Sequence, residues 1–197
     1  MPLGAFKAGL MGASGATAAA DVVLLSSQTA TNSSAIEFTS GIDSTYGEYI
    51  FKFYNLNPAT DGAEFVFQFN ASGQSGYNEA VTYTHLYAAH AEDDGETQFQ
   101  YDGSFDSGDT HTSSVIFAAN IGNGGDESAA GELHVFNPSN TTYVTNFNGE
   151  ISAYYEGNRN YDIFIGGYVN ATAAIDEIEF KMSTGNFDGK IKMWGVK

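Results

Sequence analysis

Two short segments of the chain place aromatic side chains at every second position, and no other feature constrains the fold as strongly. They are GEYIFKFYNL (residues 47–56) and AEFVFQFN (residues 63–70). Successive side chains of a β-strand point to opposite faces, so each segment gathers its rings on one face. We expect these faces to form the core, where each buried ring contributes roughly 1.5–3 kcal/mol; an exposed row that binds sugars is the alternative. The first segment carries Tyr49, Phe51, Phe53 and Asn55 on one face and Ile50, Lys52, Tyr54 and Leu56 on the other, and the second gathers Phe65, Phe67 and Phe69.

The rest of the chain also consists of short alternating segments separated by turn residues. Its 197 residues include 15 Phe, 12 Tyr and 23 Gly but only 3 Pro, a composition typical of all-β proteins. Residues 21–197 are therefore predicted to form one domain, a two-sheet antiparallel jelly-roll-like β-sandwich. The predicted strands are Val22–Ser26, Ala35–Thr39, Glu48–Leu56, Glu64–Asn70, Val81–Tyr87, Thr97–Tyr101, Ser114–Ala119, Glu132–Phe136, Tyr143–Phe147, Ile151–Tyr155, Tyr161–Tyr168, Ile175–Met182 and Lys190–Val196.

The segment DEIEFKMSTGNFDGKIKMWGVK (residues 176–197) alternates apolar and charged side chains on both sides of a Gly/Asn/Asp-rich bend. Asp188-Gly189 is a tight-turn signal, so we expect a β-hairpin that completes the sandwich and holds no site. Opposite charges paired across it would add roughly 0.2–1 kcal/mol per pair. Its inner face is predicted to carry Asp176, Ile178, Phe180, Met182, Ile191 and Met193, and its outer face Glu177, Glu179, Lys181, Lys190 and Lys192.

The segment MPLGAFKAGLMGASGATAAA (residues 1–20) is rich in Ala and Gly and carries one Lys and no acid. A signal peptide would place Lys7 at its charged end, but the middle of the segment lacks the continuous apolar run of such peptides. We expect an extended N-terminal arm that lies against another subunit; packing on its own domain is the alternative. The apolar anchors of this arm would be Leu3, Phe6, Leu10 and Met11.

The chain is strongly acidic, with 24 acidic against 7 basic residues and a formal net charge of -17. This charge excludes nucleic acid and anionic membranes as partners, because both require basic side chains. It indicates adaptation to salty surroundings, with binding to a cation or a cationic surface as the alternative. There is no cysteine, and therefore neither a disulfide nor a reactive thiolate.

Three blocks of the sequence resemble a widespread family of structural proteins of tailed, mainly marine, bacteriophages. These blocks are FTSGIDSTYGEYIFKFYNLNPATD (Phe38–Asp61), GELHVFNPSNTTYV (Gly131–Val144) and AIDEIEFKMSTGNFDGKIKMWGV (Ala174–Val196). The resemblance runs from about Val22 to the end of the chain. It implies a component of the virion without saying which one. We expect this component on the exterior of the particle, made in the host cytoplasm, with other virion proteins and copies of itself as partners.

No motif in the sequence predicts an enzyme. Retaining glycosidases on jelly rolls carry Glu-x-Asp-x-Glu on one strand, but Ala174 and Ile178 stand where the two glutamates belong. The histidines are His85, His90, His111 and His134, and their spacing does not suit zinc. We expect no cofactor; the one metal hypothesis is Ca²⁺ held by the loop carboxylates of Asp102, Asp106 and Asp109.

Two functions are therefore considered. The first is a non-enzymatic structural subunit of a phage particle, acting as capsid decoration or tail appendage. The second is a carbohydrate-binding module that recognises host-surface glycans from a tail fibre or baseplate. This second function predicts an exposed aromatic cluster, for which the available side chains are Tyr154, Tyr155, Tyr161, Tyr168 and Trp194.

Overall fold

The structure, a computed structural model, describes residues 21–197 except for the side chains of residues 109–111. Within this part, thirteen antiparallel strands form and no residue is helical, which confirms the all-β prediction. No helix in the described residues therefore has the length and apolar character needed to span a membrane. The strands are β1 (Val22–Ser33), β2 (Ala35–Phe38), β3 (Glu48–Pro58), β4 (Ala63–Ala71), β5 (Val81–Ala91), β6 (Thr97–Tyr101), β7 (Ser107–His111), β8 (Val115–Ile121), β9 (Ala129–Phe136), β10 (Asn146–Tyr155), β11 (Arg159–Val169), β12 (Ile175–Met182) and β13 (Phe187–Val196).

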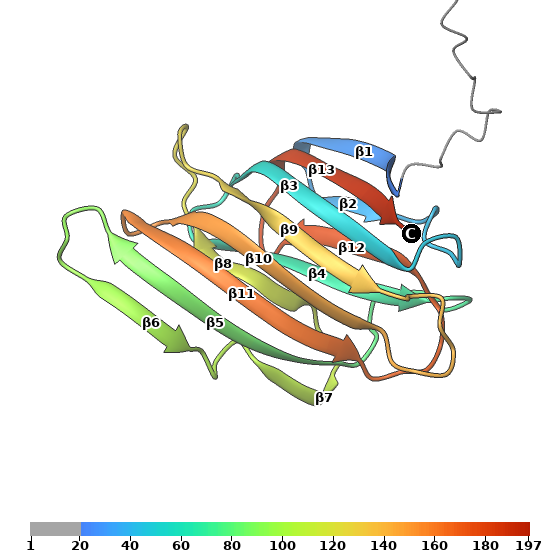
Figure 1. Ribbon diagram of the computed structural model, residues 1–197. Helices are drawn as coiled ribbons and strands as arrows, with labels where there is room; N and C mark the ends of the chain where they lie inside the picture. Colours follow the sequence, from blue (N-terminus) through green and yellow to red (C-terminus); the bar gives the residue numbers. More distant parts are fainter. Residues whose placement is uncertain (1–20) are drawn as a thin grey trace, which may run out of the picture.

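The strands form two layers of unequal width. The wider layer has the order β1-β13-β3-β9-β10-β11-β5, and β6 and β7 pair one after the other along the outer edge of β5 (Figure 1). The narrower layer has the order β2-β12-β4-β8. A single residue pair, Tyr155 with Ile121, joins the end of β10 to β8 and links the two layers at this point.

The connections between the layers are those of a jelly roll. Eight connections between consecutive strands of the described chain cross from one layer to the other: β1–β2, β2–β3, β3–β4, β4–β5, β7–β8, β8–β9, β11–β12 and β12–β13. The framework strands are β1, β13, β3 and β9 in the wider layer and β2, β12, β4 and β8 in the narrower one. These eight strands make the two four-stranded sheets of a jelly-roll sandwich. The remaining strands, β5–β7 and β10–β11, widen only one layer and extend beyond β8 (Figure 1).

The predicted aromatic faces form the core between the layers. Tyr49, Phe51, Phe53, Phe65, Phe67 and Phe69 are at most 2% exposed. Phe180 on β12 is central to this core, since its ring centroid lies within 6.2 Å of those of five other phenylalanines. The pairs with Phe38 and Phe53 meet edge to face, an arrangement that the ring quadrupole favours, whereas Phe65 stacks on Phe180 and the other two rings are tilted.

The predicted alternation of the first aromatic segment is wrong at its end. Asn55 has a backbone φ of 50° and lies exposed, and the pairing of β3 with β9 shifts register between Phe53 and Leu56. This bulge adds one residue to β3 and turns Leu56 into the core, where it is fully buried. Leu56 therefore lies on the same, inward face of β3 as Phe53, and not on the face of Tyr54.

The predicted C-terminal hairpin is also wrong. β12 pairs with β4 and β2, whereas β13 pairs with β1 and β3, so the bend between them crosses from one layer to the other. The expected cross-strand charge pairs consequently do not form, and Lys181 instead contacts Glu179 on its own strand at 2.6 Å. The inner face was predicted correctly except at Asp176, where a bulge places Ile175 in the core instead. The other predicted inner residues, Ile178, Phe180, Met182, Ile191 and Met193, are buried.

Several strand boundaries differ from the prediction because residue types that usually mark turns, such as Asn and Gly, lie inside strands. β10 is continuous through Asn148-Gly149, where the sequence analysis separated two strands. Gly149 is required there by packing, since a Cβ atom would lie 2.5 Å from Cζ of Phe117. β1 continues past Ser26 to Ser33, and β7 was not predicted.

The two ends of the described chain lie side by side. The backbone N–H of Lys197 donates a hydrogen bond to the carbonyl oxygen of Asp21 at 3.0 Å. The predicted arm (residues 1–20), with its anchors Leu3, Phe6, Leu10 and Met11, lies outside the described residues, and its contact with another subunit stays a prediction.

Candidate ligand-binding site

A cavity of about 200 Å³ lies where the wider layer extends beyond the narrower one. Strands β5, β10 and β11 supply its base, the last residues of β8 form one side, and the turn at residues 102–105 covers it. The lining residues are His85, Tyr87, Asp102, Phe105, Ala119, Asn120, Tyr155, Tyr161 and Ile163. Its position follows from the topology, because no strand of the narrower layer lies beyond β8 to fill this space.

The cavity has a buried floor and a partly exposed rim. The floor is formed by His85, Tyr87, Ala119 and Ile163, all buried. The rim is formed by Asp102, Phe105, Asn120, Tyr155 and Tyr161, all half-buried. A floor closed to solvent below a partly open rim is the form of many small-molecule sites.

His85 is the unusual group of the floor. Its side chain is 1% exposed, and neither ring nitrogen has a hydrogen-bond partner in the structure. Burial lowers the pKa of His85, against the opposing influence of the Asp102 and Asp106 carboxylates, so the ring is neutral at pH 7. A neutral imidazole offers one donor and one acceptor. Leaving such groups unpaired costs about 1–3 kcal/mol each, so both nitrogens of His85 are available to a bound group.

Three stacked tyrosines form one wall. The ring of Tyr161 lies between those of Tyr87 and Tyr155, with centroid distances of 4.8 and 4.5 Å and interplanar angles of 8° and 17°. The guanidinium of Arg159 lies 5.8 Å from the centre of the Tyr155 ring and continues the stack. Both faces of Tyr161 are therefore occupied, and the stack presents ring edges and hydroxyl groups.

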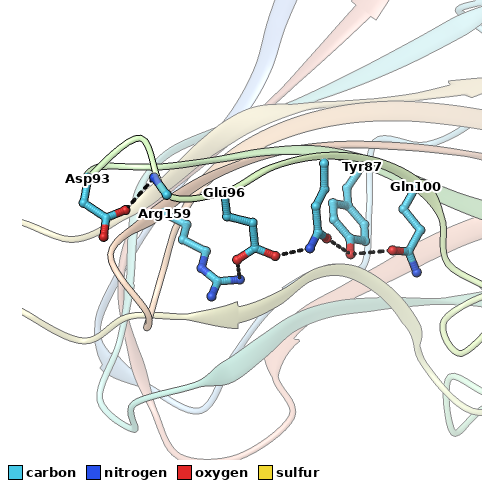
Figure 2. A network of polar contacts seen from close by, with 7 residues as sticks. Tyr87, Asp93, Glu96, Gln100 and Arg159 are labelled. Carbon is cyan, nitrogen blue, oxygen red and sulfur yellow. Dashed lines mark hydrogen bonds and ion pairs between the residues drawn. The ribbon is translucent and has the colours of Figure 1, made fainter.

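A network of one ion pair and several hydrogen bonds holds the stacked tyrosines in place. Arg159 pairs with Glu96 at 2.8 Å, and Glu96 accepts a hydrogen bond from Gln98. The Tyr87 hydroxyl donates to the side-chain oxygens of Gln98 and Gln100, at 3.0 and 3.3 Å (Figure 2). In the turn beside this network, the Asp93 carboxylate accepts the N–H of Gly95 at 2.9 Å (Figure 2). The aromatic wall is thus held in place before any ligand arrives.

Two of the three predicted calcium ligands are Asp102, in the turn that covers the cavity, and Asp106, directly after it. Asp102 accepts a hydrogen bond from the Ser104 N–H at 3.0 Å, and its carbonyl accepts one from Phe105 at 3.1 Å. The Asp106 carboxylate accepts a hydrogen bond from the Tyr101 hydroxyl. Among the described side chains, no group of three His, Asp or Glu residues is arranged to hold a metal ion. The Asp109 side chain lies outside the described residues, so calcium binding stays a prediction.

The structure brings together only two of the five aromatic residues predicted to contact glycans. Tyr155 and Tyr161 stack, whereas Tyr154, the residue before Tyr155, points to the opposite face of β10. Tyr168 lies seven residues along β11 from Tyr161, a distance of about 23 Å. Trp194 lies on β13, which β3 and β9 separate from β10, so about 14 Å of sheet intervenes.

Most residues that complete the cavity are not predicted from the sequence, and Asp102 is predicted only as a calcium ligand. His85 and Tyr87 join Tyr155 and Tyr161 only because β5, β10 and β11 are neighbours. One sequence signal was available: in VTYTHLY (residues 81–87), His85 occupies the inward register shared by Val81, Tyr83 and Tyr87. A histidine on an apolar strand face is a group that needs a partner.

A second polar cluster lies on β3 and β9, but its groups already pair with one another. His134 lies 2.5 Å from Glu48 and 3.2 Å from Glu132, and Glu132 contacts Lys52 at 2.8 Å. Lys52 and its hydrogen bond are the main reason that the pKa of Glu132 lies below its usual value. This cluster is a half-buried ion-pair network at the surface, and its groups satisfy one another.

Comparison of the chain with protein-family models, with curated proteins and with solved structures gives no match in any of the three.

Proposed function

We propose that the protein is a non-enzymatic structural subunit on the exterior of a tailed-bacteriophage particle, either as capsid decoration or as a tail appendage. The observation that carries this proposal is the position of the resembling sequence blocks in the fold. The three resembling blocks contain β3, most of β9, and both β12 and β13, and β13, β3 and β9 are direct neighbours in the wider layer. One strand from each of three blocks that are distant in sequence is thus part of one continuous stretch of the wider layer.

Two edges of the wider layer support a role in assembly. Among the described residues, β1 pairs only with β13, and it carries Val22 and Leu24 at 50% and 44% exposure. At the opposite edge, β6 carries Phe99, which is 79% exposed. Unpaired strand edges with apolar side chains favour contact with another chain. Copies of this protein and other virion proteins are the partners that we propose.

Imaging of intact particles tests this function directly. Density that traces residues 21–197 on the outside of the head or tail is the expected result. Its absence from both head and tail of purified particles that contain the protein by mass spectrometry would overturn the exterior location.

Charge variants of the β1 edge test the assembly contact. Leu24→Lys is expected to reduce incorporation into particles, because it places a charge where an apolar contact is proposed. Ser27→Lys adds the same charge at another exposed position of β1 and serves as the matched control. Equal incorporation of the two variants would remove β1 from the proposed interface.

A second function, recognition of a neutral glycan, is supported by the cavity beneath the stacked tyrosines. β5, β10 and β11, which supply its base, lie outside the three resembling blocks. The framework and the cavity can therefore serve different purposes, with one attaching the subunit and the other binding a ligand. A screen of immobilised neutral and anionic glycans with the purified protein tests this function, and binding to at least one neutral glycan is the expected result.

A further inference from the structure

We propose that the cavity below the Tyr87–Tyr161–Tyr155 stack binds a single neutral sugar residue, held by hydrogen bonds to His85 and to the rim. This inference rests on the second function proposed above. It adds the location of the site, the size of the bound group and the residues that bind it.

The size of the cavity limits the ligand. Its volume of about 200 Å³ lies below the roughly 300–1,000 Å³ of pockets that enclose drug-sized molecules. One ring with its substituents fits such a space, whereas a longer glycan would leave its other residues outside. The half-buried rim at Asp102, Asn120 and Tyr155 gives a longer chain a way out.

The donors and acceptors of the cavity favour hydroxyl groups. Both nitrogens of His85 lack a partner in the structure, and the neutral ring requires one donor and one acceptor. A hydroxyl group satisfies either need, and two neighbouring hydroxyl groups satisfy both. On the rim, Asp102 supplies a carboxylate acceptor and Asn120 supplies an amide.

The apolar part of the wall fits the C–H groups of a sugar ring. The Phe105 ring stands over His85, with centroids 5.4 Å apart and an interplanar angle of 62°. Ile163 and Ala119 complete the apolar surface of the floor. The faces of Tyr161 are occupied by Tyr87 and Tyr155, so these rings act as a rigid wall that presents its edges. A wall fixed in advance reduces the entropy lost on binding.

Charge favours a neutral ligand over an anionic one. The chain has a formal net charge of -17, and Asp102 and Asp106 both act on His85. An anionic sugar would meet this negative field without a compensating basic group, because the Arg159 side chain is already paired with Glu96.

The test uses saturation-transfer NMR on the full chain, with methyl glycosides of glucose, galactose, mannose and N-acetylglucosamine as neutral probes. N-acetylneuraminic acid and spermidine are the anionic and cationic probes. Binding of at least one neutral glycoside, but neither charged probe, is the expected result. Binding of spermidine alone, or of no glycoside, would overturn the inference.

Variants locate the site. His85→Leu removes both nitrogens at similar volume and is expected to weaken binding of the best glycoside at least tenfold. His90→Leu removes the exposed imidazole on the opposite face of β5, and its affinity should stay within twofold of the unchanged protein. Asp102→Asn is a second cavity variant that can keep the acceptor for Ser104 and should weaken binding at least threefold if His85→Leu does not fold.

The variants also separate this inference from glycan recognition as such. If the protein binds a glycan from the immobilised screen and both cavity variants bind it equally well, recognition stands and its location in this cavity is wrong. If the unchanged protein binds no glycan in either experiment, both proposals fail. Incorporation into particles is measured independently and is unaffected by either outcome.

Discussion

The rings of Tyr155 and Tyr161 lie nearly parallel across the β10–β11 pair, with centroids 4.5 Å apart and an interplanar angle of 17°. Offset stacking of this kind adds roughly 0.5–1.5 kcal/mol to the burial of the rings. Because Tyr87 lies on the other side of Tyr161, the middle ring links β5 to β10 across β11.

Tyr161→Ala is expected to lower the free energy of unfolding by about 2–3 kcal/mol, since it removes a half-buried ring and both of its stacking contacts. Tyr161→Phe keeps the ring and should cost less than about 1 kcal/mol. Urea denaturation followed by far-ultraviolet circular dichroism measures both. Equal losses for the two variants would show that the hydroxyl, and not the stack, matters.

Phe180 should be among the most sensitive positions of the core. Phe180→Ala leaves a cavity among five phenylalanine rings and is expected to cost about 3–5 kcal/mol. Phe99→Ala removes the same ring from an exposed position of β6 and should change stability by no more than about 0.5 kcal/mol. Thermal and urea unfolding compare the pair, and similar effects at the two positions would contradict the described core.

A substitution at Gly149 tests how closely β10 approaches β8. In Gly149→Ala, the new Cβ atom would lie 2.5 Å from Cζ of Phe117 and 2.8 Å from the carbonyl oxygen of Glu132. We expect a loss of about 1–3 kcal/mol from this overpacking. Gly166→Ala on β11 is the control, because a Cβ atom there meets nothing within 4 Å. A neutral Gly149→Ala would show that the two strands lie further apart.

His85 should make stability depend on pH in a defined direction. Burial holds the pKa of His85 below its usual value, whereas the unfolded chain restores it to about 6.5. Below this pH the unfolded state binds a proton that the folded state resists, so the free energy of unfolding falls as the pH falls. Between pH 7.5 and 5.5, the decrease should be smaller in His85→Gln than in the unchanged protein and in His90→Gln. Identical slopes for all three proteins would contradict a neutral, buried His85.

Salt should stabilise the fold. With a formal net charge of -17, the folded chain repels itself, and ions screen this repulsion beyond roughly 3 Å at 1 M ionic strength. The melting temperature is expected to rise between 0.05 and 1 M NaCl, measured by calorimetry. A fall over this range would mean that the ion pairs that salt weakens, such as Lys52 with Glu132, outweigh the repulsion.

The sequence predicted the fold class and the core because both depend on local alternation. Phe65, Phe67 and Phe69 face inward because a strand has a period of two, and this holds whichever strands are its neighbours. The pairing of strands could not be predicted in the same way. The bend before β13 has the composition of a hairpin turn, yet burial of two apolar faces in opposite layers decides the connection.

The candidate site was predictable only in part, because its residues come from strands whose pairing the sequence does not reveal. Tyr155 and Tyr161 are close in sequence and lie on two paired strands that a short turn connects. The sequence alone therefore suggests that these two rings are neighbours. His85 and Tyr87 reach them from β5, about seventy residues earlier, through the pairing of β5 with β11. No local sequence pattern encodes that pairing. The bulge at Asn55, where the backbone is left-handed, likewise cannot be predicted from the alternation of side chains.

The hydrogen bond between Lys197 and Asp21 brings the two ends of the described chain to one place on the sandwich. A segment that continues the chain from either of these two residues therefore leaves the sandwich beside the other one. The same proximity permits a circularly permuted chain in which residue 197 is joined to residue 21 and new ends are opened in the turn at residues 156–158. Such a permuted protein would leave the framework intact while moving its ends next to Tyr155 at the rim of the cavity.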